Sequence, residues 1–235
     1  MSRTVDRIAE NHRKVGERIA AACARRGRSP ESVTLVAVTK YAELEWVRAL
    51  AELGARDLGE SRPQQLAERA ALIEPPVRWH LIGPLQRNKT RRILPLVSLI
   101  HSVDSLRLLE WIGKLAVELQ LRPRVLIEVN VSGEEAKHGF APQQLIDQWD
   151  QTLAVHGVEL AGLMTMAPYE ASEDRQGGVF AGLRELRDRL VSLSPAEMRL
   201  PELSMGMSDD FEVAIEEGST IVRVGSALFE GLTPS

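Results

Sequence analysis

The distribution of apolar positions along the chain predicts a regular alternation of strands and helices. Apolar residues recur at helical spacing over residues 5–24, and a glycine and a proline end this first helix. Residues 33–39 then form a run of β-branched and apolar residues that predicts a strand, and residues 43–53 return to helical spacing before Gly54. The first helix therefore precedes, as an addition, the first unit of one strand and one helix.

Seven further strand candidates follow. They are nearly continuous apolar runs, which is typical of a parallel sheet covered on both faces. Each strand except the last precedes a helix candidate, and the helix after the last strand is short. The sequence predicts an α/β protein with a single domain over residues 1–235, a (β/α)8 TIM barrel with an extra N-terminal helix. An open doubly wound sheet, the alternative, suits eight units in about 200 residues less well. The further strand candidates are residues 56–59, 78–82, 99–103, 124–131, 160–164, 202–204 and 220–224.

Composition narrows the class of protein and of partner. Hydrophobic residues make up 44% of the 235 residues and charged residues 26%, which excludes disordered, collagen-like and disulfide-stapled chains. The net charge of −4 gives no overall positive field, so we expect neither nucleic acid nor membrane as a partner. A single cysteine, Cys23, and the lack of a long apolar stretch or an apolar leader predict a cytoplasmic protein.

In a TIM barrel the functional groups lie where the strands end, so Lys40 is the first candidate. It ends the most apolar of the predicted strands. Burial there would favour the uncharged amine, which is a nucleophile toward carbonyl groups. A lysine that extends from the strand end into solvent is the alternative, and the local sequence leaves both open.

The ends of the last two strands predict an anion site. Gly225 and Ser226 follow the last strand and open a short helix, where free backbone N–H groups bind phosphate. An ordinary strand-to-helix turn is the alternative. Ser208 follows the seventh strand and would cap a helix over residues 209–217, donate to a phosphate, or both. Arg223 interrupts an apolar strand, so it needs an acceptor inside the barrel or a carboxylate on an outer helix.

Taken in order, these and other segments resemble the pyridoxal phosphate homeostasis protein family, which is related to the barrel domain of alanine racemase. The resemblance covers nearly the whole chain, and eight segments in order are far more specific than any one alone. The segments are VAVTK at 36–40, LGESRPQ at 58–64, WHLIGPLQRNK at 79–89, HSVDS at 101–105, EVNV at 128–131, KHGF at 137–140, GLMTM at 162–166 and the stretch 203–229.

The resemblance implies a fold-type III protein that binds pyridoxal 5′-phosphate (PLP) as its cofactor. By this carry-over Lys40 holds PLP as a covalent Schiff base, which agrees with its interpretation as a carbonyl-trapping amine. Ser208, Gly225 and Ser226 would hold the phosphate, and Arg223 would face the pyridine nitrogen. A cationic donor at that nitrogen keeps it unprotonated and weakens the ring as an electron sink.

Three further cofactor contacts are implied, at Ser61, Ser204 and Met207. The family reads Gly-Glu-Asn where this chain has Gly59-Glu60-Ser61. Ser61 is shorter than asparagine and lacks its amide donor, so we expect its contact to pass through water. Without the resemblance, Glu60 is interpreted as an acid at the start of the following helix, where the helix dipole favours a negative charge.

The resemblance implies a protein that carries PLP as a Schiff base and takes part in intracellular PLP (vitamin B6) homeostasis. We expect a monomer without robust catalytic activity, and PLP-dependent apoenzymes as recipients. The alternative is a PLP-dependent, racemase-like enzyme with weak or restricted activity. Alanine racemase takes a second acid/base, a tyrosine, from a separate C-terminal domain, whereas here Tyr41 and Tyr169 precede Arg223 and only 12 residues follow it. A third hypothesis is a barrel acting on a phosphorylated metabolite.

Two remaining signals receive structural interpretations. The basic residues Arg87, Lys89, Arg91 and Arg92 lack interleaved aromatics and indicate a solvated helix face rather than an RNA site. His80 and His101 end neighbouring strands without the spacing of a metal site, so we expect histidines hydrogen-bonded in the core or at the rim, and no metal. 

Overall fold

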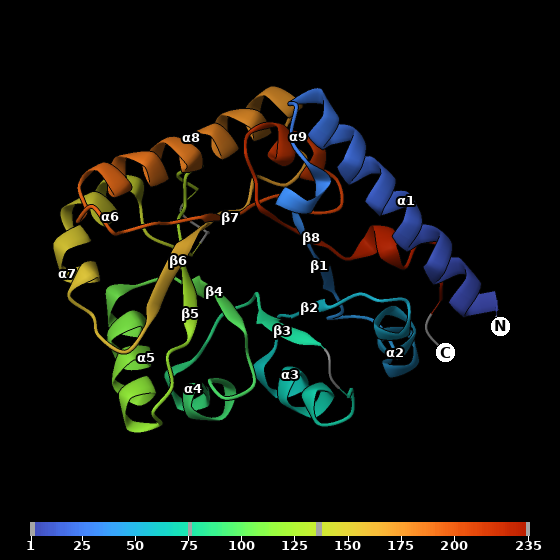
Figure 1. The fold of residues 1–235 in the computed structure, drawn as a ribbon, viewed down its shortest axis with the longest axis horizontal. Helices are drawn as coiled ribbons and strands as arrows, with labels where there is room; N and C mark the ends of the chain where they lie inside the picture. Colours follow the sequence, from blue (N-terminus) through green and yellow to red (C-terminus); the bar gives the residue numbers. More distant parts are fainter. Residues whose placement is uncertain (1–2, 75–76, 135–137, 234–235) are drawn as a thin grey trace.

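Eight parallel strands close into a barrel in the order in which they occur along the chain (Figure 1). The computed structural model describes residues 3–74, 77–134 and 138–233, so Lys137 of the KHGF segment lies outside the described residues. All eight predicted strands are confirmed, with small shifts of their bounds. The strands are β1 (Thr34–Val38), β2 (Asp57–Glu60), β3 (Arg78–Leu81), β4 (Leu99–Val103), β5 (Arg124–Glu128), β6 (Glu159–Met164), β7 (Glu202–Ser204) and β8 (Ile221–Val224).

The largest shift of a strand boundary concerns β5, which ends at Glu128 instead of residue 131. Beyond Glu128, Val129 N still donates to Met164 O of β6, but the next residue bonds to another segment. Asn130 N donates to Phe140 O, and Phe140 N donates to Glu128 O, each at 2.9 Å. The chain after β5 therefore folds back on itself at the barrel mouth.

Helices cover the outside of the barrel, and one helix stands apart from the repeat. The first helix, α1, packs against α2, α9 and η2, and Figure 1 shows it lying beside α9. Its apolar stripe, which includes Ile8, Val15 and Ile19, is buried, and Asn11 Nδ2 donates to Leu228 O at 3.2 Å. The predicted TIM barrel with an extra N-terminal helix is thus confirmed. The helices are α1 (Arg3–Arg25), α2 (Leu44–Glu52), α3 (Pro63–Ala70), α4 (Arg87–Ile93), α5 (Leu106–Glu118), α6 (Pro142–Asp147), α7 (Trp149–Leu153), α8 (Glu173–Ser192) and α9 (Phe211–Glu216), with the 3-10 turns η1 (Pro30–Ser32) and η2 (Ser226–Leu228).

The barrel interior holds its own apolar cluster, separate from the layer between sheet and helices. Its members include Val36 of β1, Leu99 of β4 and Ile221 of β8. Side chains along a strand alternate between the two faces, so Val38 follows Val36 on the interior side. The interior cluster thereby sets which residues face the mouth where the strands end. Among the described helices, none combines the length and apolar character needed to cross a bilayer.

A glycine in β6 lets two strands approach closely. Gly162 pairs with Glu202 of β7 next to an irregularity in the register of β5 and β6. A methyl group at Gly162 would overlap the carbonyl carbon and oxygen of Glu202. Because those atoms belong to the backbone of a paired strand, they cannot move aside without breaking the pairing.

An arginine of α3 fixes the segment that follows β1. Arg69 is buried, and its guanidinium donates to Thr39 O, to Ala42 O and to Glu60 Oε1. Thr39 Oγ1 also donates to Glu60 Oε1, and burial raises the pKa of Glu60 against the opposing effects of Thr39 and Arg69. The interpretation of Glu60 as a helix-start acid is therefore wrong: this carboxylate is wholly buried and anchors the turn that presents Lys40.

We expect Gly162→Ala to lower the free energy of unfolding by about 3 kcal/mol, because the added methyl group forces the β6–β7 pair apart. Gly178→Ala is the matched control: no atom lies within 4 Å of a methyl group at that exposed helical position. It should raise stability by roughly 0.5–1 kcal/mol, because alanine restricts the unfolded chain. Urea unfolding of both variants measures the difference, and equal stability of the two would contradict the close-packing argument.

We expect Arg69→Met to lower the free energy of unfolding by about 3 kcal/mol, because it leaves Glu60 buried without its cation. Arg91→Met is the control, since it removes an exposed pair with Glu118 and should change stability by about 1 kcal/mol or less. Adding Glu60→Gln to Arg69→Met removes the orphaned charge and should recover part of the loss. Denaturant unfolding of the three variants checks this order, and equal losses for Arg69→Met and Arg91→Met would contradict it.

Candidate functional site

Lys40 lies at the mouth of the barrel, directly after β1. Ala42 N donates to Thr39 O at 2.8 Å, which closes a tight turn with Lys40 and Tyr41 at its tip. Lys40 is exposed, and its Nζ lies 5.1 Å from the centroid of the Tyr41 ring. Tyr41 is itself 77% exposed, as expected for a rim residue. The amine is thus accessible on a turn whose backbone Arg69 holds.

The loops after β7 and β8 meet through a buried serine hydroxyl. Ser208 Oγ accepts from Gly225 N at 3.2 Å and from Ala227 N at 3.4 Å. Arg223 N donates to Gly206 O at 3.0 Å and joins the same two segments. Two backbone N–H groups therefore converge on one hydroxyl at the start of η2, an arrangement suited to an anion. Ser226 and Met207 lie exposed beside it.

The predicted helix cap at Ser208 is wrong. Helix α9 begins at Phe211, and Asp210 occupies the N-cap position. Asp210 Oδ1 accepts from Met207 N, which closes the turn before the helix. The hydroxyl of Ser208 is consequently free of the helix and turned toward the end of β8.

Closure of the barrel places Lys40 and the Ser208–Gly225 turn at adjacent strand ends. β1 pairs with β8, with Ala37 opposite Val224, so Gly225 follows beside Val38. A methyl group at Gly225 would lie 3.3 Å from Val38 O. On the other side β1 pairs with β2, and Val38 lies opposite Gly59. Half-buried Ser61, two residues further on, therefore directly follows the strand adjacent to β1.

Arg223 points into the barrel, so the alternative of an outer carboxylate partner is wrong. Its Nη1 donates to Ser204 Oγ, and its Nη2 donates to Thr165 O at 3.0 Å. Burial lowers the pKa of Arg223 to about 10, while the charges of Asp210 and Glu128 act in the opposite direction. At neutral pH it remains a buried cation whose hydrogen-bond partners are a hydroxyl and a carbonyl.

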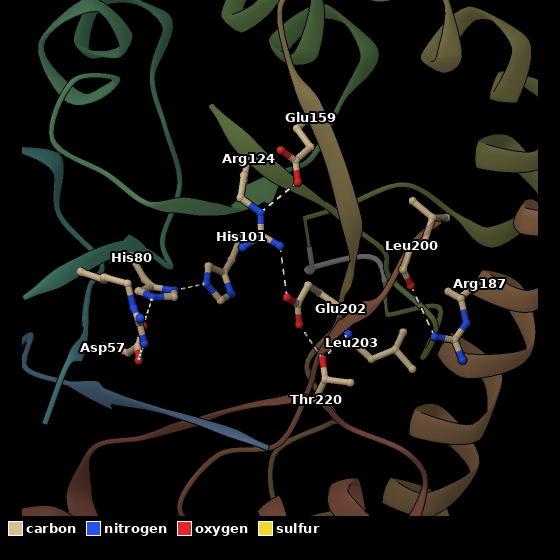
Figure 2. Close-up of polar contacts among 11 residues, drawn as sticks. Asp57, His80, His101, Arg124, Glu159, Arg187, Leu200, Glu202, Leu203 and Thr220 are labelled. Atoms are coloured by element: carbon tan, nitrogen blue, oxygen red, sulfur yellow. Dashed lines mark hydrogen bonds and ion pairs between the residues drawn. The ribbon is translucent and has the colours of Figure 1, made fainter. Parts of the chain in front are cut away.

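A continuous hydrogen-bonded chain leads from Ser204 to the opposite end of the barrel. His101 Nδ1 lies 2.8 Å from Ser204 Oγ, and His101 Nε2 lies 2.9 Å from His80 Nδ1. His80 Nε2 lies 2.9 Å from Asp57 Oδ1, and Arg78 donates to both oxygens of Asp57. Figure 2 shows His80 between Asp57 and His101. Both histidines are therefore hydrogen-bonded in the core, as the sequence predicts.

The pKa values of Asp57 and His101, two members of this hydrogen-bonded chain, are both lowered. Burial raises the pKa of Asp57, but the hydrogen bonds from Arg78 and His80 outweigh it and bring the pKa to about 2. Burial, with the charges of His80 and Arg223, lowers the pKa of His101 well below its usual range. At neutral pH Asp57 is ionised and His101 is neutral. Within the described residues, no group of three histidine, cysteine or acidic side chains is placed to hold a metal ion.

Sequence reasoning missed Glu128 and Asp210 as members of the site. Both are buried, and burial raises the pKa of each carboxyl. Asp104 raises the pKa of Glu128 further, and Arg223 lowers the pKa values of both. A signal for Glu128 was present, because it lies at the end of the apolar run of β5, where functional groups of a barrel are expected.

Comparison with known proteins supports one family. Residues 5–234 match the family model of the alanine racemase N-terminal domain. A pyridoxal phosphate homeostasis protein of Aquifex aeolicus is 43% identical over 217 residues, which cover 92% of this chain and 94% of that protein.

Two solved structures extend the comparison. PipY of Synechococcus elongatus, solved with PLP bound, has a TM-score of 0.81 at 34% identity and covers 92% of this chain and 99% of its own. Alanine racemase of Clostridium difficile has a TM-score of 0.75 at 16% identity, covering 98% of this chain and 58% of that enzyme, and shows the shared fold alone. The chain belongs to the pyridoxal phosphate homeostasis protein family, whose barrel has the fold of the alanine racemase N-terminal domain.

Proposed function

We propose that this protein binds PLP at the barrel mouth, holds it covalently on Lys40, and takes part in intracellular PLP homeostasis. The observation that carries the proposal is the pairing of β1 with β8, which places Lys40 and the Ser208–Gly225 turn at adjacent strand ends. The family and the PLP bound to the related PipY support the same ligand.

The residues at the mouth fit the charges of PLP. Ser208 Oγ accepts from the N–H groups of Gly225 and Ala227, which leaves its hydroxyl hydrogen to donate to a phosphate, with Ser226 exposed next to it. Arg223 supplies a buried positive charge a short distance below this turn, on the same strand. An anion with a flat, polar ring is thus matched by donors at its phosphate and by a cation facing its ring nitrogen.

Each group has a separate task in holding the ligand. PLP supplies an aldehyde that a primary amine captures and a ring that withdraws electrons. The Lys40 amine adds to the aldehyde, and one water leaves, which gives a reversible Schiff base. Ser208, Gly225 and Ser226 hold the phosphate, while Ser61, Ser204 and Met207 line the surroundings.

Arg223 favours storage of PLP over catalysis. A guanidinium only donates hydrogen bonds, so a ring nitrogen that faces it stays unprotonated. An unprotonated nitrogen stabilises a neighbouring carbanion poorly, which suppresses reactions at the α-carbon of amino acids. The exposed Lys40 leaves the attachment point open to competing amines and to water. These features support a carrier that releases PLP to PLP-dependent apoenzymes, and we extend the proposal to a cytoplasmic monomer formed by a single domain.

We expect the PLP-loaded protein to show a visible absorbance band that borohydride abolishes, with one phosphopyridoxyl group fixed on Lys40. Lys40→Ala should lose both the band and the fixed group, because it removes the amine. Lys89→Ala is the matched control, since it removes another described lysine near the start of α4. Absorbance spectra and peptide mass spectrometry measure the result. A Lys40→Ala protein with an unchanged, reducible band would exclude Lys40 as the attachment point.

We expect no α-proton exchange above that of free PLP when the loaded protein is incubated with L- or D-amino acids in deuterated water. The reason is the donor-only partner that Arg223 presents to the ring. Proton NMR of the amino acids measures the exchange, and alanine racemase provides a positive control. Rapid exchange that disappears in Lys40→Ala would favour the racemase-like enzyme instead.

A further inference from the structure

The hydrogen-bonded chain in the barrel interior connects the barrel floor to the mouth. Asp57 is the first residue of β2 and Arg78 the first of β3, so both lie at the floor. Ser204 is the last residue of β7, and its hydroxyl accepts from Arg223 near the mouth. Asp57, His80, His101, Ser204 and Arg223, which we call the relay, thus span the barrel through side chains alone.

The relay has a fixed direction when both imidazoles are neutral. Ionised Asp57 only accepts, so His80 donates from Nε2 and must accept at Nδ1. His101 then donates from Nε2 to His80 and accepts at Nδ1, so the Ser204 hydroxyl donates to His101. The oxygen of Ser204 remains free to accept from Arg223.

One added proton on His80 reverses this direction. A doubly protonated His80 donates from Nδ1, so neutral His101 must accept at Nε2 and carry its own proton on Nδ1. His101 then donates to Ser204 Oγ, which already accepts from Arg223. The Ser204 hydroxyl hydrogen must leave its place between Ser204 and His101. Protonation near the floor is therefore coupled to the partner of Arg223 at the mouth.

The charged groups around the relay decide where a proton resides. Asp57 and Arg78 flank His80, whereas Arg223 faces the Ser204 end, together with Glu128 and Asp210. The cationic Arg223 disfavours a charge on His101, and the anionic Asp57 favours one on His80. The flanking charges thus differ at the two ends of the relay, with the anion Asp57 at His80 and the cation Arg223 on the side of His101.

We propose that Asp57, His80, His101 and Ser204 are positioning residues that set the hydrogen-bonding state of Arg223 and, through it, the properties of the bound ligand. This inference rests on the proposed function, because the ligand that faces Arg223 is PLP. The relay lies beside apolar residues of the barrel interior such as Val36 and Leu99. Buried polar side chains are costly in such an interior unless every partner is satisfied.

The barrel floor offers a matched control. Arg124 pairs with Glu159 and Glu202, and Thr220 Oγ1 donates to Glu202 Oε2 at 2.8 Å. In Figure 2 the dashed lines of this network join Arg124, Glu159, Glu202 and Thr220, and none of them ends at His101 or His80. Glu202→Gln therefore disturbs a similar polar network without touching the relay.

Nitrogen-15 NMR of histidine side chains in the ligand-free protein tests the direction of the relay. At alkaline pH we expect both His80 and His101 to carry their proton on Nε2. In any state in which the nitrogen-15 shifts show two protons on His80, His101 should carry its proton on Nδ1 while it stays neutral. A His101 that keeps its proton on Nε2 while His80 carries two protons overturns the relay, and so does a neutral pair with a proton on Nδ1 of either ring.

The pH midpoint of the absorbance change of bound PLP tests the link to Arg223. We expect His101→Leu and Ser204→Ala to shift this midpoint by about 0.5 unit or more. His101→Gln retains a donor and an acceptor and should restore most of the wild-type value, and Glu202→Gln should leave it unchanged. Ser204→Ala removes one hydroxyl and decides the result if His101→Leu does not fold. Midpoints equal to wild type in folded Ser204→Ala or His101→Leu overturn the inference, whereas wild-type protein without a reducible band overturns the proposed function.

Discussion

The pairing of β1 with β8 is the constraint on which the candidate site depends. By itself, Lys40 is an exposed lysine on a turn. Closure of the barrel places Gly225 beside Val38 and so gives Lys40 a neighbouring turn rich in backbone donors. The register is as important as the pairing, because a slip of one residue would exchange the interior and exterior faces of β8 and turn Arg223 toward the helices. Close packing in the interior opposes such a slip, since Val36 and Ile221 fill it together.

Burying a charge costs free energy, and the buried arginines on the two sides of the sheet are compensated by different partners. Outside the barrel, Arg69 and Glu60 form a buried ion pair whose further bonds fix the backbone around Lys40. Inside, Arg223 forms no such ion pair with any residue that the structure describes: a hydroxyl, a carbonyl and the more distant charges of Glu128 and Asp210 compensate its burial. A cation whose hydrogen-bond partners are neutral can still attract an anionic or neutral acceptor, whereas Arg69 already bonds to a carboxylate and two carbonyls. The same residue type therefore fixes the backbone on one face and, in the proposed function, binds the ligand on the other.

The sequence predicted the parts of the molecule that follow from local pattern. Apolar runs identified all eight strands because both faces of each are covered, and strand ends identified Lys40, Gly225 and Arg223 as candidates. Contacts between distant strands were not predictable in this way. The bond between His101 and Ser204 joins residues 103 positions apart, and it exists only once the barrel closes. Ser208 and Glu60 misled for a related reason: each matches a helix-start pattern, but a partner from another strand or helix offers a stronger contact. Local propensity yields to tertiary contacts at those two positions.

Storage and release of PLP make opposite demands, and the site separates them in space. In the proposed function, firm retention needs a phosphate site and a ring partner that do not move, and the groups proposed for them, Ser208 and Arg223, are each hydrogen-bonded within or against the closed barrel. Release needs access to the covalent bond, and Lys40 extends from an exposed turn at the mouth. Substrate turnover would add a third demand, a protonated ring that accepts electrons, which a donor-only guanidinium opposes. Under the proposed function, an arginine at this position therefore favours reversible capture of an aldehyde over carbanion chemistry.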